Sequence, residues 1–249
     1  MDSTPVSSSN GLRVAVTGGT SGLGLALVDA LRRDGAEVAF VARNEGRVRE
    51  VASRWPGTHG IAGDVSRKEQ THRIAMRITA ALGGLDVLIN NASSLGPVPL
   101  ALLADTECEQ LEEALATNLV GPFRLTRALL GTLAAAAREG RPAVVINVVS
   151  DAALNPYPGW GAYGASKAAL WQLSRIWDEE LALHGVRVQA VDPGDMDTPL
   201  HALAVPDADP ASLKRPAEAA AEIVDLLATL AHARGASHES GEHADAAAG

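Results

Sequence analysis

Tyr163 and Lys167 stand four residues apart in the segment YGASKAALWQL, which we interpret as a helix. Four residues of helix rise about 6 Å and bring both side chains to one face, so the two groups can share a site. A tyrosine hydroxyl ordinarily ionises at about pH 10, and a neighbouring cation can make it an acid and base at neutral pH. The spacing permits proton transfer, and a packed tyrosine beside a solvated amine is the alternative.

The elements that must position this pair alternate between short apolar runs and longer amphipathic stretches. Strands are predicted at 12–18, 36–42, 58–63, 85–91, 142–150 and 186–194. Helices are predicted at about 23–34, 45–54, 67–83, 107–138, 160–184 and 216–229. Such alternation indicates a doubly wound α/β fold, a parallel sheet with helices on both faces. Ligands of these sheets bind outside the carboxyl ends of the strands, so the residues after each strand are the candidates for function.

A glycine-rich turn, TGGTSGLG at 17–24, follows the first strand. Glycines at 18, 22 and 24 permit a tight turn and let the backbone approach a pyrophosphate at the start of the next helix. An ordinary glycine-rich turn is the alternative. Because a strand precedes the turn and a helix follows it, the segment favours dinucleotide binding.

The second and third strands end in residues suited to an adenosine group. Arg43 lies where an acidic residue would hold a ribose hydroxyl, and it can pair with a 2'-phosphate, with Thr20 or Ser21 as further donors. An arginine at this position favours NADP(H) over NAD(H). The alternative is that Arg43 is an ordinary surface arginine with no role in cofactor binding. Asp64 could accept from the adenine amino group, although capping the following helix is an equally good role for Asp64 or Ser66.

The candidate residues at the remaining strand ends can each be explained by local structure alone. Residues 90–93, NNAS, can be simple turn formers, and Ser150 can be a commonplace strand-end serine. Asn118 lies inside a predicted helix before a glycine and a proline, which is locally unfavourable and can mean a kink. The segment DPGDMDT at 192–198 can be a chain reversal.

The composition fits one large α/β domain. The chain has 249 residues, of which 47% are hydrophobic and 20% charged, enough to bury a sizeable core. Because both ends lose apolar periodicity, we expect a disordered segment at 1–10, a single domain at 11–230 and a mostly flexible tail at 231–249. The tail contains His232, His238 and His243, which we expect to be solvated, and we expect no metal site.

The net charge of -9 argues against a nucleic-acid or anionic-membrane surface, because phosphate backbones need a basic footprint. No stretch has the ~18 uninterrupted apolar residues of a membrane span, and the N-terminus has no basic start or apolar core. We expect a cytoplasmic protein with a small-molecule partner, binding neither nucleic acid nor membrane. The single cysteine, Cys108, cannot form an intramolecular disulfide and is expected to be structural.

The candidate residues occur in the order of one known family. They are Thr17, Gly18, Gly22, Gly24, NNA at 90–92, Asn118, Ser150, YGASK at 163–167 and PGDMDT at 193–198. Together they resemble the compact, single-domain branch of the short-chain dehydrogenase/reductase family, from about residue 12 to 230. The resemblance implies a Rossmann fold with strand order 3-2-1-4-5-6 and an uncertain seventh strand. It also implies hydride transfer between a nicotinamide and a carbonyl or secondary alcohol.

The same resemblance implies a role for each residue. Tyr163 would exchange a proton with the substrate oxygen, Ser150 would hydrogen-bond that oxygen, and Lys167 would lower the pKa of Tyr163 and bond the nicotinamide ribose. Asn118 would hold a water that relays protons toward Lys167. The implied cofactor-binding residues are Gly18, Thr20, Ser21, Gly22, Leu23, Gly24, Arg43, Asp64, Val65, Asn91, Ala92, Tyr163, Lys167, Pro193, Gly194, Met196 and Thr198.

Two features depart from the family pattern. Only a short seventh strand at about 240–247 looks possible, which puts a tetramer in doubt and leaves a homodimer through the helices at 107–138 and 160–184. Ser93 replaces the usual glycine, for which we expect a local adjustment without loss of function. A catalytically silent NADP(H)-binding sensor or scaffold is the alternative function. The residues at 94–99, 151–160 and 199–214 that should line the substrate pocket do not name the substrate.

Overall fold

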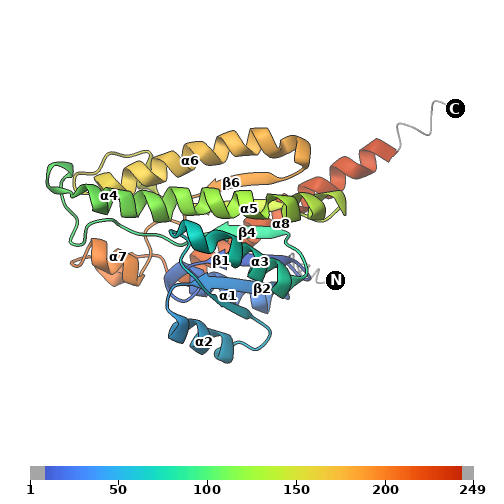
Figure 1. Ribbon diagram of the computed structural model, residues 1–249, viewed down its shortest axis with the longest axis horizontal. Helices are drawn as coiled ribbons and strands as arrows, with labels where there is room; N and C mark the ends of the chain where they lie inside the picture. The colour runs from blue at the N-terminus through green and yellow to red at the C-terminus, as the bar shows by residue number, and fades with distance from the viewer. Residues whose placement is uncertain (1–8, 243–249) are drawn as a thin grey trace.

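The computed structural model describes the backbone of residues 9–242 and the side chains of residues 9–230. Its centre is a six-stranded sheet in the order β3-β2-β1-β4-β5-β6 with every pairing parallel, as predicted. Figure 1 shows the strands in the middle of the molecule, surrounded by helices. The strands are β1 (Arg13–Thr17), β2 (Glu37–Ala42), β3 (His59–Ala62), β4 (Val87–Asn90), β5 (Val144–Val148) and β6 (Arg187–Val191). The order reverses between β1 and β4, the place where sheets of this kind bind ligands.

Helices cover both faces of the sheet. They are α1 (Gly22–Arg33), α2 (Glu45–Arg54), α3 (Thr71–Leu82), α4 (Cys108–Leu115), α5 (Gly121–Arg138), α6 (Gly161–Leu181), α7 (Pro199–Ala204) and α8 (Pro216–Glu242). Apolar side chains of α1, α2 and α8 pack on one face, and those of α3, α5 and α6 pack on the other. Successive residues of β1 point to opposite faces, Val14 and Val16 to the first and Ala15 to the second. Burial on both sides explains why the strands are almost uniformly apolar.

The helical stretch predicted at 107–138 is divided in the structure. Between α4 and α5 the chain makes one π-helical turn, Ala116–Val120, and Asn118 lies inside it, fully buried. A π-helical turn inserts an extra residue into the helix and turns side chains away from the ordinary helical register. The unfavourable asparagine therefore marks a π-helical turn that tertiary hydrogen bonds stabilise.

The C-terminal helix is longer than predicted. The sequence predicted an end near 229 and a short strand at about 240–247, whereas α8 continues to Glu242. The strand prediction is thus wrong for residues 240–242, and residues 243–247 lie outside the described ones, as does His243. Alanine, arginine and glutamate in this segment favour a helix, and each glycine opposes it by only about 1 kcal/mol. The domain limits themselves stay a prediction.

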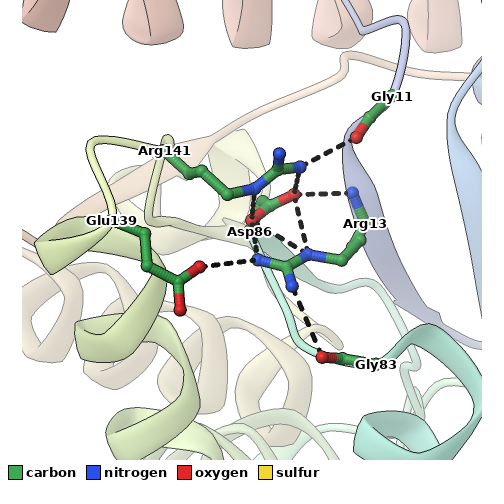
Figure 2. Close-up of polar contacts among 6 residues, drawn as sticks. All are labelled: Gly11, Arg13, Gly83, Asp86, Glu139 and Arg141. Atoms are coloured by element: carbon green, nitrogen blue, oxygen red, sulfur yellow. Dashed lines mark hydrogen bonds and ion pairs between the residues drawn. The ribbon is translucent and has the colours of Figure 1, made fainter.

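At the amino-terminal edge of the sheet, an ion-pair cluster around Asp86 joins β1 and the segment before β5 to the start of β4 (Figure 2). Asp86, which directly precedes β4, is fully buried. Its carboxylate accepts from the backbone N of Arg13 at 2.8 Å and from Nη2 of Arg141 at 2.6 Å. Burial raises the pKa of Asp86, but the hydrogen bonds from Arg141 and Arg13 outweigh it and leave the pKa below its ordinary value. Arg141 also donates to the Gly11 carbonyl at 2.8 Å.

No helix among the described residues is both long enough and apolar enough to span a membrane.

Candidate active site

A cavity of about 720 Å³ opens at the carboxyl ends of the strands. Its walls come from the segments that follow all six strands, together with the first residues of α6 and the loop around α7. All predicted catalytic and cofactor-binding residues except Asn118 line this cavity. The fold thus brings together residues that are up to 180 positions apart, from Gly18 to Thr198 (198 − 18).

The glycine turn after β1 has the shape of a phosphate cradle. A Cβ on Gly24 would lie 2.2 Å from the Gly18 carbonyl oxygen, and one on Gly18, whose φ is +73°, would lie 2.9 Å from Nδ2 of Asn91. Only glycine fits at these two positions. Ser21 precedes α1 and makes no side-chain cap, so the first amides of the helix can bind an anion. The turn therefore fits the pyrophosphate of a dinucleotide.

Asn91 and Ala92, predicted beside the cofactor ribose, also brace this turn. Nδ2 of Asn91 donates to the carbonyl of Thr17 at 2.8 Å, and the backbone amides of Asn91 and Ala92 both donate to Oγ1 of Thr17 at 3.0 Å. These bonds join the end of β4 to the end of β1. The side chain of Asn91 is therefore occupied in holding the glycine turn in place.

The end of the cavity after β2 carries two arginines. Arg43 follows β2 directly, and Arg47 lies in the first turn of α2, where its backbone amide is capped by Asn44 at 3.0 Å. The sequence analysis missed Arg47, whose position follows from the start of α2 at Glu45. Asp64 also lines the cavity, and its Oδ1 accepts from the amide and the hydroxyl of Ser66 at 2.9 and 2.7 Å. Neither the 3₁₀ turn Lys68–Gln70 nor α3 has a side-chain cap, so the capping role considered for Asp64 or Ser66 is wrong, whereas Asp64 does line the cavity.

Tyr163, Lys167 and Ser150 meet at the other end of the cavity. Tyr163 and Lys167 both lie on α6 and are 8% and 2% exposed. Nζ of Lys167 donates to the Val148 carbonyl at the end of β5 at 2.7 Å and lies 5.5 Å from the centroid of the Tyr163 ring. Ser150 and Ser93 lie near the Tyr163 phenol and lower its pKa. Burying a lysine amine costs folding free energy, so lysines are rarely buried. Because the amine of Lys167 is buried, the alternative of a packed tyrosine beside a solvated amine is disfavoured.

Burial shifts the pKa values of Tyr163 and Lys167 in opposite directions. Desolvation raises the pKa of Tyr163 to about 12, and the nearby Asp192 and Asp151 also raise it, while the Ser150 and Ser93 hydroxyls lower it. Desolvation lowers the pKa of Lys167 to about 8. At neutral pH the phenol is therefore protonated and can donate a proton, and Lys167 is close to its own titration.

Asn118 lies behind this site, outside the cavity wall. Its Oδ1 accepts from the amide of Ser94 at 2.8 Å and the hydroxyl of Ser93 at 3.1 Å. Its Nδ2 donates to the Ser94 carbonyl and the Ser166 hydroxyl, both at 2.8 Å. A side-chain amide can make four such bonds, so the amide of Asn118 is saturated. It ties the segment after β4 to α6.

Ser93 is a site residue whose role the sequence analysis missed. The sequence identified it only as a replacement for glycine, but its hydroxyl donates to Oδ1 of Asn118, and Ser93 also lowers the pKa of Tyr163. Among the described residues every positive φ belongs to a glycine, so Ser93 occupies its place without backbone strain. Its proximity to Tyr163 depends on tertiary packing, which the local sequence does not indicate.

The segment after β6 closes the nicotinamide end of the predicted cofactor site. Pro193, Gly194, Met196 and Thr198 all line the cavity. Oδ1 of Asp192 accepts from the Gly194 amide at 3.0 Å, and Thr198 caps α7. The predicted chain reversal is therefore present, and it forms part of the cavity wall.

Comparisons with known proteins identify the family. The family model "short chain dehydrogenase" matches residues 13–209. General stress protein 39 of Bacillus subtilis is 33% identical over 192 residues, which cover 74% of this chain and 63% of the relative, so the chain spans less than two thirds of that protein. Glucose 1-dehydrogenase of Gluconobacter oxydans is 33% identical, with 76% of this chain and 71% of the relative covered.

Solved structures of the same fold include complexes with a bound nicotinamide cofactor. A short-chain dehydrogenase from Shigella flexneri complexed with NADP has a TM-score of 0.79 at 28% identity, covering 89% of this chain and 91% of the other. A 3-ketoacyl-(acyl-carrier-protein) reductase from Brucella melitensis complexed with NADH has a TM-score of 0.82 at 26% identity, covering 88% and 92%. The fold, the family model and the relatives agree, and this chain belongs to the short-chain dehydrogenase/reductase family.

Proposed function

We propose that the chain is an NADP(H)-dependent oxidoreductase that acts on a carbonyl or secondary alcohol group of a small molecule. The observation that carries the proposal is the meeting of Tyr163, Ser150 and buried Lys167 at one end of a cavity whose other end holds the glycine turn and Arg43. When bound there, the cofactor supplies or accepts a hydride. The residues of the chain bind, orient and exchange the proton.

Tyr163 is the general acid and base of this proposal. In reduction its phenol gives a proton to the substrate oxygen, and in oxidation the phenolate takes the proton back. The raised pKa keeps the phenol protonated and ready for reduction. When substrate binds, the Ser150 hydroxyl turns its proton from Asp151 Oδ1 to the same substrate oxygen and stabilises the charge that develops on it.

Lys167 and Asn118 support the proton transfer. Lys167 bonds the nicotinamide ribose and, as a cation, favours the ionised form of the Tyr163 phenol. Because the side-chain amide of Asn118 is saturated by protein groups, a relay water held by this residue binds its backbone carbonyl in the π-helical turn.

The preference for NADP(H) rests on the basic residues after β2. Arg43 and Arg47 both line the cavity at that strand end, where a 2'-phosphate would lie. The cavity lining there contains no carboxylate between Ala42 and Arg47 that would hold a free ribose hydroxyl instead. The solved relatives include both NADP and NADH complexes, so the preference is argued from the residues of this chain.

We further propose a cytoplasmic homodimer that packs through α5 and α6. Phe123 of α5 stacks on Trp177 of α6 with ring centroids 5.2 Å apart, and Phe123 and Ile176 remain partly exposed on this face. A stacked aromatic pair at the surface is typical of a protein interface. Light scattering of the purified protein measures the mass and tests this assembly.

The experiment that tests the proposed reaction replaces Tyr163 by phenylalanine. Oxidation of NADPH is followed by absorbance with a panel of aldehydes and ketones, and binding of NADPH is followed by fluorescence. We expect the turnover found with the native chain to fall by about 10²–10⁴-fold in Tyr163→Phe, with NADPH affinity nearly unchanged. A Tyr163→Phe protein that retains full turnover would show that another group transfers the proton.

A further inference from the structure

Asp151 places a carboxylate beside the hydroxyl that meets the substrate oxygen. It follows Ser150 in the chain and lines the cavity. The Ser150 hydroxyl donates to its Oδ1 at 3.1 Å, and the Tyr157 hydroxyl donates to its Oδ2 at 2.7 Å. A carboxylate has about four acceptor positions, so each oxygen can accept a further hydrogen bond from a ligand.

The two ends of the cavity differ in charge. Arg43 and Arg47 line it after β2 and Asp64 lines it after β3, which leaves a positive excess there, whereas Asp151 lines it after β5, and Asp192 and Asp195 line it after β6. In the sheet order β1 and β4 lie between β2 and β5, which separates the two ends by about 14 Å at the usual strand spacing. The acidic end therefore repels a substrate carboxylate or phosphate and attracts a cation.

The cations at the acidic end do not neutralise it. Lys167 is buried, and its Nζ already donates to the Val148 carbonyl. Nε2 of His201 lies 4.0 Å from Asp195. Nδ1 of His201 is buried without a hydrogen-bond partner among the described residues. Asp151 thus has two neutral hydroxyl partners and no ion pair in the described chain.

Part of the cavity lining near these polar groups is apolar. Leu95, Ala152 and Tyr163 form a small buried cluster against which Trp160 and Leu200 pack. All five residues line the cavity. This part of the lining suits an aromatic or aliphatic substituent on the reacting carbon.

We propose that the substrate is a secondary alcohol, or its ketone, with a positively charged amino group on the carbon next to the reacting carbon, and that Asp151 binds this ammonium. The inference rests on the proposed function, which places the reacting oxygen at Tyr163 and Ser150. In a vicinal amino alcohol the nitrogen lies about one hydrogen-bond length from the hydroxyl oxygen, comparable to the 3.1 Å between Ser150 Oγ and Asp151 Oδ1. One ligand can therefore bind both groups at once.

A matched series of ligands tests the proposal. The probes are 2-amino-1-phenylethanol, 1-phenyl-1,2-ethanediol and mandelate, each as both enantiomers, which share a phenyl carbinol and carry a positive, neutral or negative neighbour. Their affinities for the protein saturated with NADP⁺ are measured by calorimetry at neutral pH. We expect the amino alcohol to bind about tenfold or more tightly than the diol, and mandelate most weakly, because hydrogen bonds to a charged group are the stronger ones.

Two variants assign the preference to Asp151. Asp151→Asn keeps the shape and one of the two acceptor oxygens but removes the charge, so the amino alcohol should bind about as tightly as the diol. Asp207→Asn makes the same charge change at an exposed position outside the cavity lining and should keep the native preference.

The outcomes separate this inference from the proposed function. Equal affinity for the three probes, a preference that survives in Asp151→Asn, or no binding of the amino alcohol to a protein that binds NADP⁺ would each overturn the substrate inference alone. A native protein that does not bind NADP⁺ would overturn the proposed function and this inference together.

Discussion

At the scale of single residues, burial raises the pKa of Tyr163 and lowers the pKa of Lys167. The pKa of the phenol rises to about 12 and that of the amine falls to about 8, because desolvation disfavours the charged form of each. Strongly shifted pKa values are common at functional sites, and both of these residues line the cavity. The free energy of unfolding should reflect these shifts.

The first prediction concerns the pH dependence of stability in the chain without cofactor. Between pH 8 and the ordinary lysine pKa of 10.5, the unfolded chain keeps the Lys167 proton and the folded chain releases it. The unfolded state then binds more protons, so this residue makes stability rise with pH, by at most about 1.4 kcal/mol per pH unit. Urea unfolding of the native protein and of Lys167→Met between pH 8 and 10 measures the difference in slope. Parallel slopes would show that the amine titrates normally.

At the scale of elements, the turn between β1 and α1 depends on the close approach of the Gly24 backbone to the Gly18 carbonyl. In Gly24→Ala the new Cβ would lie 2.2 Å from the Gly18 carbonyl oxygen, so the turn must distort. We expect NADPH affinity to fall by more than about tenfold, because the helix amides no longer converge on one anion, and stability to fall by about 1–3 kcal/mol. Titration by nicotinamide fluorescence and thermal unfolding measure both effects.

Gly131 in α5 is the matched control. A Cβ there meets nothing within 4 Å. Because alanine is the better helix former, Gly131→Ala should raise stability by about 0.5–1 kcal/mol and leave NADPH affinity unchanged. Equal behaviour of the two variants would contradict the assignment of the turn as a phosphate cradle.

Local patterns predicted some elements better than others. The six strands and their order follow from apolar periodicity and a family resemblance, because burial on both faces leaves a strong mark on β1 to β5. The π-helical turn at Ala116–Val120 depends on four hydrogen bonds from Asn118 to distant segments, so no local pattern specifies it. The end of α8 was misplaced because its glycines look like helix stops.

The same distinction holds for the site. Tyr163, Lys167 and Ser150 were predicted because their types and positions after strands suit the chemistry, and the structure brings them together. Ser93 and Arg47 were missed because their places depend on packing and on where α2 begins. Their roles at the site stay predictions.

At the scale of the whole molecule, the Asp86 cluster joins segments that are far apart in the sequence (Figure 2). The carboxylate binds Arg13 of β1 and Arg141 before β5, which are 73 and 55 residues away. Asp86→Asn removes the buried charge that both guanidinium groups contact, and removal of one partner from a buried pair usually costs about 3–5 kcal/mol. Chemical unfolding at neutral pH measures this loss.

The pH dependence of the same cluster has a defined sign. Because the folded pKa of Asp86 is depressed, its contribution is present above the ordinary value of 3.8 and is lost as the pH falls through the folded pKa. Glu45→Gln is the control, since the exposed pair of Glu45 with Arg49 should contribute nothing measurable. An Asp86→Asn protein as stable as the native chain would show that the cluster does not hold the sheet together.

The charge difference between the two ends of the cavity also depends on the whole sheet, because different strands supply the two ends. The proposed role of the basic end in NADP(H) binding can be tested without knowledge of the substrate. The most direct measurement is a titration of the native chain, Arg43→Ala and Arg49→Ala with NADPH and NADH, followed by nicotinamide fluorescence. Arg49 is an exposed arginine of α2 outside the cavity lining and serves as the charge-matched control. We predict that the native chain and Arg49→Ala bind NADPH at least about tenfold more tightly than NADH, and that Arg43→Ala loses most of this preference. Binding of neither nucleotide would contradict the proposed oxidoreductase function, and equal binding of both by all three proteins would contradict the assignment of Arg43 to the 2'-phosphate.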